Sequence, residues 1–359
     1  MTTLVAQTAE VRADFIERCG TPLNRRIIDA MIASSRAKNG NLMPPGWTAD
    51  DFIADTTRIA RTAELFTITP EMFDLVGHAA TSLPPQTLDR FDLPAMNGWL
   101  HLPSPITIDD VRGDPITITD LVWSERTLVR DGVSPGRGMP AHARGILIHA
   151  FTPTGDPSDP LVERLDPAML RRLVAETPKA SLVHTQTVAF GRLSWALAAG
   201  DGTPQAVRDA YALASLHDGE VVEDYDDGEY LVRTQSGHTI KVRPDPFVQF
   251  LKTYFHFVKS ELAAIDRENA PRSMRRWLRQ LDMPMGPVSV IRLRRHAYTG
   301  TAGEGHALTY RYVRRGHWRR QWYGSGGDKY QRHIWIAPTI CGPEDGPLRV
   351  RDTVNAVVR

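Results

Sequence analysis

The spacing of apolar residues changes from helical to strand-like near residue 90. Before that point, apolar positions recur every three or four residues, which predicts amphipathic helices over residues 8–19, 23–35 and 48–66. The third of these begins with Thr48 as the N-cap and has Asp51 three residues later, a weaker variant of the capping box. Thr69 followed by Pro70 predicts the start of a fourth, shorter helix, because proline is tolerated in the first helical turn.

Alternating apolar and polar residues then predict strands separated by turns rich in Pro, Gly and Asp, over residues 98–102, 106–108, 116–119 and 145–149. Helices are predicted again at 166–176 and 204–216, whereas residues 182–195 are compatible with either a strand or a helix. The clearest helix covers residues 247–265, which carry a wide apolar stripe. A short basic helix at 271–281 follows, and the last predicted strands are residues 288–293, 307–313, 333–336 and 354–358.

These elements predict an α+β fold with three regions. We expect a helical N-terminal region at 1–90 and a mixed α/β body at 91–270 that contains an acidic loop at 217–246. A basic C-terminal antiparallel sheet region is expected at 271–359.

Charge separates the two ends of a chain whose formal net charge is only +1. Residues 272–359 contain 17 Lys and Arg against 6 Asp and Glu, whereas the preceding residues contain 26 against 36. The basic end therefore attracts either the acidic body or a separate acidic partner.

Composition excludes several classes of protein. The two cysteines, Cys19 and Cys341, are too few for a disulfide framework or for a cysteine-based structural zinc site. No signal peptide and no apolar run long enough for a membrane span is present. We therefore expect a cytoplasmic protein without metal, cofactor or membrane partner. Nucleophile-elbow, zinc-protease and Rossmann motifs are missing as well, so an enzyme is the less favoured expectation.

The most distinctive segment is residues 308–336, which combines Arg and His with large aromatic residues and includes three of the eight tryptophans. Read with a period of two, it predicts a strand with a mostly aromatic inner side and a basic outer side. Such a surface suits an acidic partner, above all single-stranded nucleic acid. The candidate binding residues are Arg314, Arg315, His317, Trp318, Arg319, Arg320, Trp322, Tyr323, Lys329, Arg332 and Trp335.

Three interpretations of this segment stay open. The first is binding of RNA or of a peptide, in which Arg contacts the acidic groups and the aromatic rings stack or pack. The second is metal-independent RNA cleavage, in which His317 and His333 exchange protons with the substrate and Arg315 stabilises the phosphorane. In the third, the strands are purely structural and the basic end docks on the acidic half of the same chain.

The order of residues in this segment resembles a family of phage proteins. An Arg-Gly-His-Trp strand ending at Trp318 is followed by Trp322, a Gly-x-Gly turn at 324–326 and a return strand through Trp335. This pattern is similar to the tail of the phage-encoded type V-A anti-CRISPR family, the second of the AcrVA inhibitors. Residues 83–100 and 290–295 resemble two further parts of the same family.

The resemblance implies an accessory protein of a phage or mobile element. Members of the family are thought to recognise the nascent N-terminal peptide of the type V effector nuclease during translation and to lower its mRNA. The expected partner is accordingly a peptide or nascent-chain target protein, with RNA or the ribosome as a further partner. The present chain departs from the family pattern by continuing past the motif, through residues 338–359.

Overall fold

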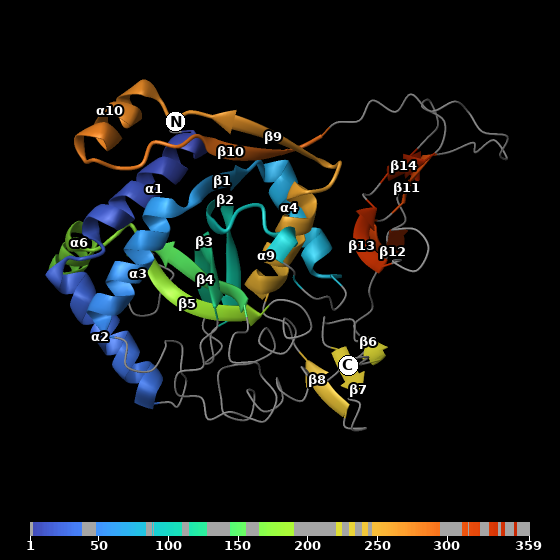
Figure 1. Cartoon of the computed structure of the whole chain (residues 1–359), viewed down its shortest axis with the longest axis horizontal. Coiled ribbons are helices and arrows are strands. Elements are labelled where there is room, and N and C mark those ends of the chain that lie inside the picture. Colours follow the sequence, from blue (N-terminus) through green and yellow to red (C-terminus); the bar gives the residue numbers. More distant parts are fainter. Residues whose placement is uncertain are drawn as a thin grey trace.

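A seven-stranded mixed sheet lies at the centre of the protein, with helices on both of its faces (Figure 1). The structure is a computed structural model. It describes residues 3–37, 48–83, 88, 90–109, 115–127, 144–155, 165–189, 220–224, 230–233, 239–242, 246–294, 311–314, 316–323, 330–336, 339–341 and 348–349. This architecture confirms the α+β class predicted from the sequence.

The strand order in the central sheet is β5-β4-β3-β2-β1-β10-β9. β1 is parallel to both of its neighbours, β2 and β10, whereas all the other pairs are antiparallel. In chain order the strands are β1 (Glu64–Ile68), β2 (Asn97–Asp109), β3 (Pro115–Thr127), β4 (Arg144–Pro153), β5 (Ala180–Ala189), β9 (Ala263–Glu268) and β10 (Val288–Leu293).

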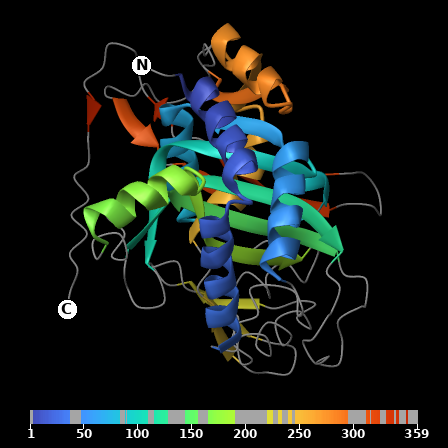
Figure 2. The same cartoon turned by 90° about the vertical axis from the view of Figure 1, so that its left-hand side faces the viewer.

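Two groups of helices cover the two faces of this sheet, as Figure 2 shows for the face that carries α1 and α3. That face packs against α1 (Leu4–Arg18), α3 (Ala49–Thr62) and α10 (Arg272–Gln280). The other face packs against α4 (Pro70–Ala80) and α9 (Pro246–Val258). α2 (Pro22–Ala37) contacts α3, and α6 (Pro167–Glu176) contacts α2. A short 3-10 helix, η1 (Arg90–Asp92), precedes β2.

Alternating side chains along each strand contribute to the hydrophobic cores on both faces of the sheet. In β2, Trp99 packs in the cluster on the α1 face and Leu100 in the cluster on the α9 face, and both are fully buried. Leu65 and Phe66 divide between the two faces of β1 in the same way. Successive strand residues point to opposite sides, so a strand buried on both faces is apolar at consecutive positions.

Two predicted helices extended too far, into the strands that follow them. The helix predicted over residues 48–66 ends at Thr62, and the apolar residues after it form β1. The helix predicted over residues 247–265 ends at Val258, after which Ala263 begins β9. In both cases apolar residues of a strand continued a helical spacing by coincidence. The capping box of Thr48 and Asp51 is present as predicted.

The expected boundary at residue 271 does not separate two sheets. The basic helix predicted at 271–281 is α10, and the strand predicted at 288–293 is β10. However, β10 pairs with β1 and β9 and therefore belongs to the central sheet. Burial of Val288 and Ile291 on its two faces explains this position, since an outer strand of a separate sheet would not need both.

Smaller sheets account for other parts of the chain. The region predicted as an acidic loop at 217–246 contains three antiparallel strands, β6 (Glu220–Asp224), β7 (Tyr230–Arg233) and β8 (Thr239–Val242). Near the C-terminus, β11 (Arg311–Arg314) pairs with β14 (Thr339–Cys341) and β15 (Leu348–Arg349). The predictions for residues 204–216 and 354–358 lie outside the described residues.

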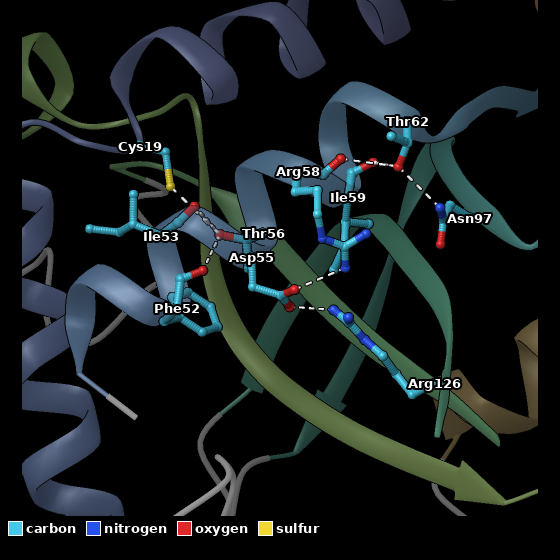
Figure 3. A network of polar contacts seen from close by, with 10 residues as sticks. All are labelled: Cys19, Phe52, Ile53, Asp55, Thr56, Arg58, Ile59, Thr62, Asn97 and Arg126. Atoms are coloured by element: carbon cyan, nitrogen blue, oxygen red, sulfur yellow. Dashed lines mark hydrogen bonds and ion pairs between the residues drawn. The ribbon is translucent and has the colours of Figure 1, made fainter. Parts of the chain in front are cut away.

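Polar contacts fasten α3 to the central sheet (Figure 3). The two carboxylate oxygens of Asp55 bind Arg58, at 2.9 Å within α3, and Arg126 of β3. Two turns after Asp55, Asn97 of β2 donates to the hydroxyl of Thr62 at 3.0 Å. α3 is thus tied to two neighbouring strands by side chains as well as by its apolar face.

Candidate binding surface on the C-terminal hairpin

The predicted basic aromatic strand is part of a hairpin formed by β12 (His317–Tyr323) and β13 (Tyr330–Ile336). The two strands pair in antiparallel register, with Trp318 opposite Trp335 and Tyr323 opposite Tyr330. The single strand expected from residue 308 onwards is therefore interrupted, because β11 ends at Arg314 and pairs in a different sheet. The Gly-x-Gly turn at 324–326 lies outside the described residues.

Two tryptophans attach this hairpin to the body. Trp318 donates its indole N–H to the backbone oxygen of Ala79, at the end of α4, over 3.1 Å. Its ring centroid lies 5.4 Å from that of Trp335 and 6.2 Å from that of Phe257 in α9. Trp335 is only 7% exposed and belongs to the core cluster on the α9 face.

These contacts correct part of the predicted binding surface. Trp335 is buried and Trp318 is half-buried, so both serve as anchors of the hairpin rather than as groups presented to a partner. The sequence showed that aromatic residues alternate along the strand, but it carried no signal that α4 and α9 provide their docking site.

Other residues of the hairpin do face solvent. Trp322 is 59% exposed and Tyr323 is 39% exposed, and the side chains of His317 and Arg319 are exposed as well. No carboxylate of the described residues lies within ion-pair distance of Arg319. At this position the basic side of the strand is open, as the binding interpretation requires.

For three of the remaining candidate residues the structure describes the backbone alone. The backbone positions of Arg314, Arg320 and Arg332 are fixed in β11, β12 and β13, but their side chains lie outside the described residues. Arg315 and Lys329 lie entirely outside them.

The register bears on the cleavage interpretation. His333 is paired with Arg320, three residues along β12 from His317. Positions an odd number of residues apart in a strand belong to opposite faces, so the two histidines occupy positions on opposite sides of the hairpin. A shared substrate would need both on the same side, and the register of the hairpin does not place them so.

Half-buried His101 and buried His149, both outside the hairpin, have shifted pKa values. Burial opposes protonation of His101, but attraction to Asp120 and a 2.9 Å hydrogen bond with its carboxylate outweigh this effect and raise the pKa of His101. Trp99 donates to the same carboxylate oxygen, also at 2.9 Å. Burial lowers the pKa of His149 to about 4. This pair of findings concerns stability, since neither histidine adjoins the hairpin.

Within the described residues, no group of three or more His, Cys, Asp or Glu side chains is arranged to hold a metal ion. None of the helices described is both long and apolar enough to cross a membrane.

Residues 213–343 match the AcrVA2-like family, the Anti-CRISPR type V subtype A2 family. Over these residues, the family resemblance predicted from the sequence is confirmed. The AcrVA2-like segment contains α9, β9, α10, β10 and the whole β12–β13 hairpin. A solved structure, the crystal structure of AcrVA2, is similar at 12% identity over 93% of both chains, with a TM-score of 0.37. No curated protein matches the chain.

Proposed function

We propose that this protein is an anti-CRISPR accessory protein of a phage or mobile element. It binds a segment of its target protein through the solvent-exposed residues of the β12–β13 hairpin. The target is the nascent chain of a type V effector nuclease, and binding during translation lowers expression of that effector. The observation that carries the proposal is the match of residues 213–343, which include this hairpin, to an anti-CRISPR family.

The chemistry of the hairpin supports a protein partner. Trp, Tyr and Arg are the residues that most often dominate binding energy at protein interfaces. Trp322, Tyr323 and Arg319 present all three types from one strand. Trp318 and Trp335 fix the strand on the body, so little conformational entropy is lost when a partner binds.

A co-expression experiment tests this function. The protein is expressed in cells that translate a tagged type V effector, and effector protein and mRNA are both measured. We expect the wild type to lower both and to co-purify with ribosomes that translate the effector. The double variant Trp322→Ala, Tyr323→Ala should lose both effects.

Met169→Ala provides a matched control, because Met169 is an exposed apolar residue (55%) on α6. This variant should act like the wild type. Equal loss of function in both variants would show that the hairpin has no special role. An effector whose level never responds to the wild-type protein would remove the proposed function itself.

RNA is the second candidate partner for the same surface. The observation in its favour is that His317, Arg319, Gln321 and Tyr323 occupy one face of β12, while Trp322 exposes its ring from the opposite face at the end of the strand. Single-stranded RNA is held by such combinations of cations and stacking rings. Arg319→Gln would then weaken binding of a labelled single-stranded RNA, and the affinity would fall steeply with salt. Co-purification with the effector chain after ribonuclease treatment would favour the protein partner instead.

A further inference from the structure

Helix α10 has one face made of arginine. Arg272, Arg275, Arg276 and Arg279 follow the spacing i, i+3, i+4, i+7, which places them along a single stripe of the helix. All four are exposed. The opposite stripe consists of Met274, Trp277, Leu278 and Leu281, which pack into the core cluster on the α1 face of the sheet. The arginine stripe therefore faces solvent along the whole of α10.

Nothing in the described part of the chain neutralises this stripe. None of the four guanidinium groups forms an ion pair or a hydrogen bond with another described residue. Asp282 is the only acidic residue between 269 and 294. Asp266 and Glu268, which precede the helix in β9, are already bound to Arg292 at 2.8 and 2.6 Å.

The helix is also built against its own local preferences. Its first turn contains Arg272 and no acidic residue, although the positive end of the helix dipole favours a carboxylate there. Pro271 precedes it without a side-chain cap. Like charges three and four residues apart repel one another as well. An anionic partner would reverse each of these unfavourable terms at once.

We propose that the arginine face of α10 binds the phosphate backbone of a double-stranded nucleic acid. Four guanidinium groups that form no ion pair with a described carboxylate match a row of phosphates, and binding of this kind does not depend on base sequence. The aromatic residue of α10, Trp277, packs inward, so the helix offers no ring on which unpaired bases could stack. This is the reason for preferring a duplex over a single strand.

An acidic protein surface fits less well. The centre of a protein interface is usually apolar and poor in charge, whereas the exposed face of α10 is four arginines without an apolar residue among them. The surface is distinct from the hairpin, because α10 covers the α1 face of the sheet and the hairpin is anchored on the α4–α9 face (Figure 1). The proposal therefore does not rest on the function proposed for the hairpin.

Fluorescence anisotropy with the full-length protein tests this proposal. The probes are a labelled 20-base-pair RNA duplex and a DNA duplex of the same sequence, titrated from 50 to 200 mM salt. If all four arginines contact phosphates, affinity should fall about a hundredfold over this range, because each contact adds about 0.9 to the slope of log affinity against log salt. Both duplexes should bind, and the tighter one identifies the natural backbone.

Two matched double variants locate the site. Arg275→Gln, Arg279→Gln should weaken binding and lower the salt slope by about 2. Arg26→Gln, Arg171→Gln removes the same charge from exposed positions on α2 and α6 and should change neither quantity. Glutamine has a helix propensity close to that of arginine, so the variants should keep their fold, which circular dichroism checks.

Three results would overturn the proposal. The first is no binding of either duplex at 50 mM salt, and the second is an equal effect of the two double variants, which would indicate net charge alone. The third is displacement of the labelled duplex by poly-glutamate as effectively as by unlabelled duplex of equal charge, which would point to an acidic protein. Loss of duplex binding in the α10 variant with full activity against the effector would leave the hairpin proposal intact.

Discussion

Trp318 and Trp335 lie opposite each other in the β12–β13 hairpin, with ring centroids 5.4 Å apart, and both contact Phe257 of α9. This pair joins the hairpin to the central sheet's α4–α9 layer. The exposed aromatic residues at the other end of β12 are consequently held on a fixed base.

Trp318→Ala should loosen the hairpin without unfolding the body. The variant loses the bond to the Ala79 carbonyl and the contacts with Phe257, at a cost of about 2 kcal/mol in the free energy of local opening. Hydrogen exchange at the paired amides of β12 and β13 should become about thirtyfold faster. Trp322→Ala should leave exchange unchanged because Trp322 is exposed. Equal protection in wild type and Trp318→Ala would contradict the anchoring role.

Gly98→Ala should destabilise the whole fold. A methyl group at this position of β2 would lie 2.0 Å from the nearest ring carbon of Trp123, which is fully buried. We expect a loss of about 1–3 kcal/mol in the free energy of unfolding, measured by urea denaturation.

Gly77→Ala is the matched control for this change. Gly77 lies within α4, and a methyl group there would meet nothing within 4 Å. Alanine is favoured over glycine inside a helix by about 0.5–1 kcal/mol, so the control should be neutral or stabilising. If both variants lost stability equally, the close approach of Trp123 to Gly98 could not be the cause.

His149 should make the protein sensitive to acid. Its folded pKa is about 4, below the ordinary value of 6.5, because the ring is buried. Between these two values the unfolded chain takes up a proton that the folded protein does not, so stability falls as the pH drops, by about 1.4 kcal/mol per pH unit at most.

His149→Phe should reduce this slope between pH 6 and pH 4.5, as measured by urea unfolding at each pH. The aromatic contact with Phe52 tolerates a phenyl ring, which keeps the site filled. His101 does not contribute to this acid slope. Its pKa is raised in the folded protein, so the stability that it provides is lost only as the pH rises above the ordinary histidine value. An unchanged acid slope in the variant would show that other groups control it.

Asp282→Gly should stabilise the end of α10. Asp282 has a φ of 50°, and the amide of Met283 binds the carbonyl of Leu278 at 2.9 Å, which together form a Schellman ending. Glycine adopts this backbone conformation without strain, so thermal or urea unfolding should show a gain of about 0.5–1 kcal/mol. Gln280→Gly, inside the last helical turn, should instead lose up to about 1 kcal/mol. A loss of stability in Asp282→Gly would indicate that its carboxylate matters more than its backbone.

Local signals predicted much of the fold, and long-range pairing limited the rest. Thr48 and Asp51 mark the start of α3 because capping depends on residues close in sequence. The end of the same helix was predicted too late, because the apolar residues Leu65 and Phe66 belong to β1. That strand pairs with β10, which lies far along the chain. The place of β10 in the central sheet could not be predicted for the same reason.

In the candidate site too, local features were predicted and features that depend on distant residues were not. Alternation in residues 317–323 correctly indicated a strand with an open basic residue, Arg319. The alternation could not indicate that Trp335 is buried in the core, because the residues that pack around Trp335 come from α4 and α9. The basic character of α10 was predicted from the sequence, but the exposure of its arginine stripe depends on the burial of Trp277 and Leu278 beneath it.

The position of β1 sets the order in which this molecule can be completed. Its two parallel neighbours both follow it in the chain, β2 soon after and β10 much later, with Leu65 paired both to Trp99 and to Val288. A growing polypeptide can build β1 through β5 early, but one side of β1 then stays an unsatisfied, apolar edge until β10 has been synthesised. Any fragment that stops before β10 would expose that edge, and we expect it to aggregate rather than to fold.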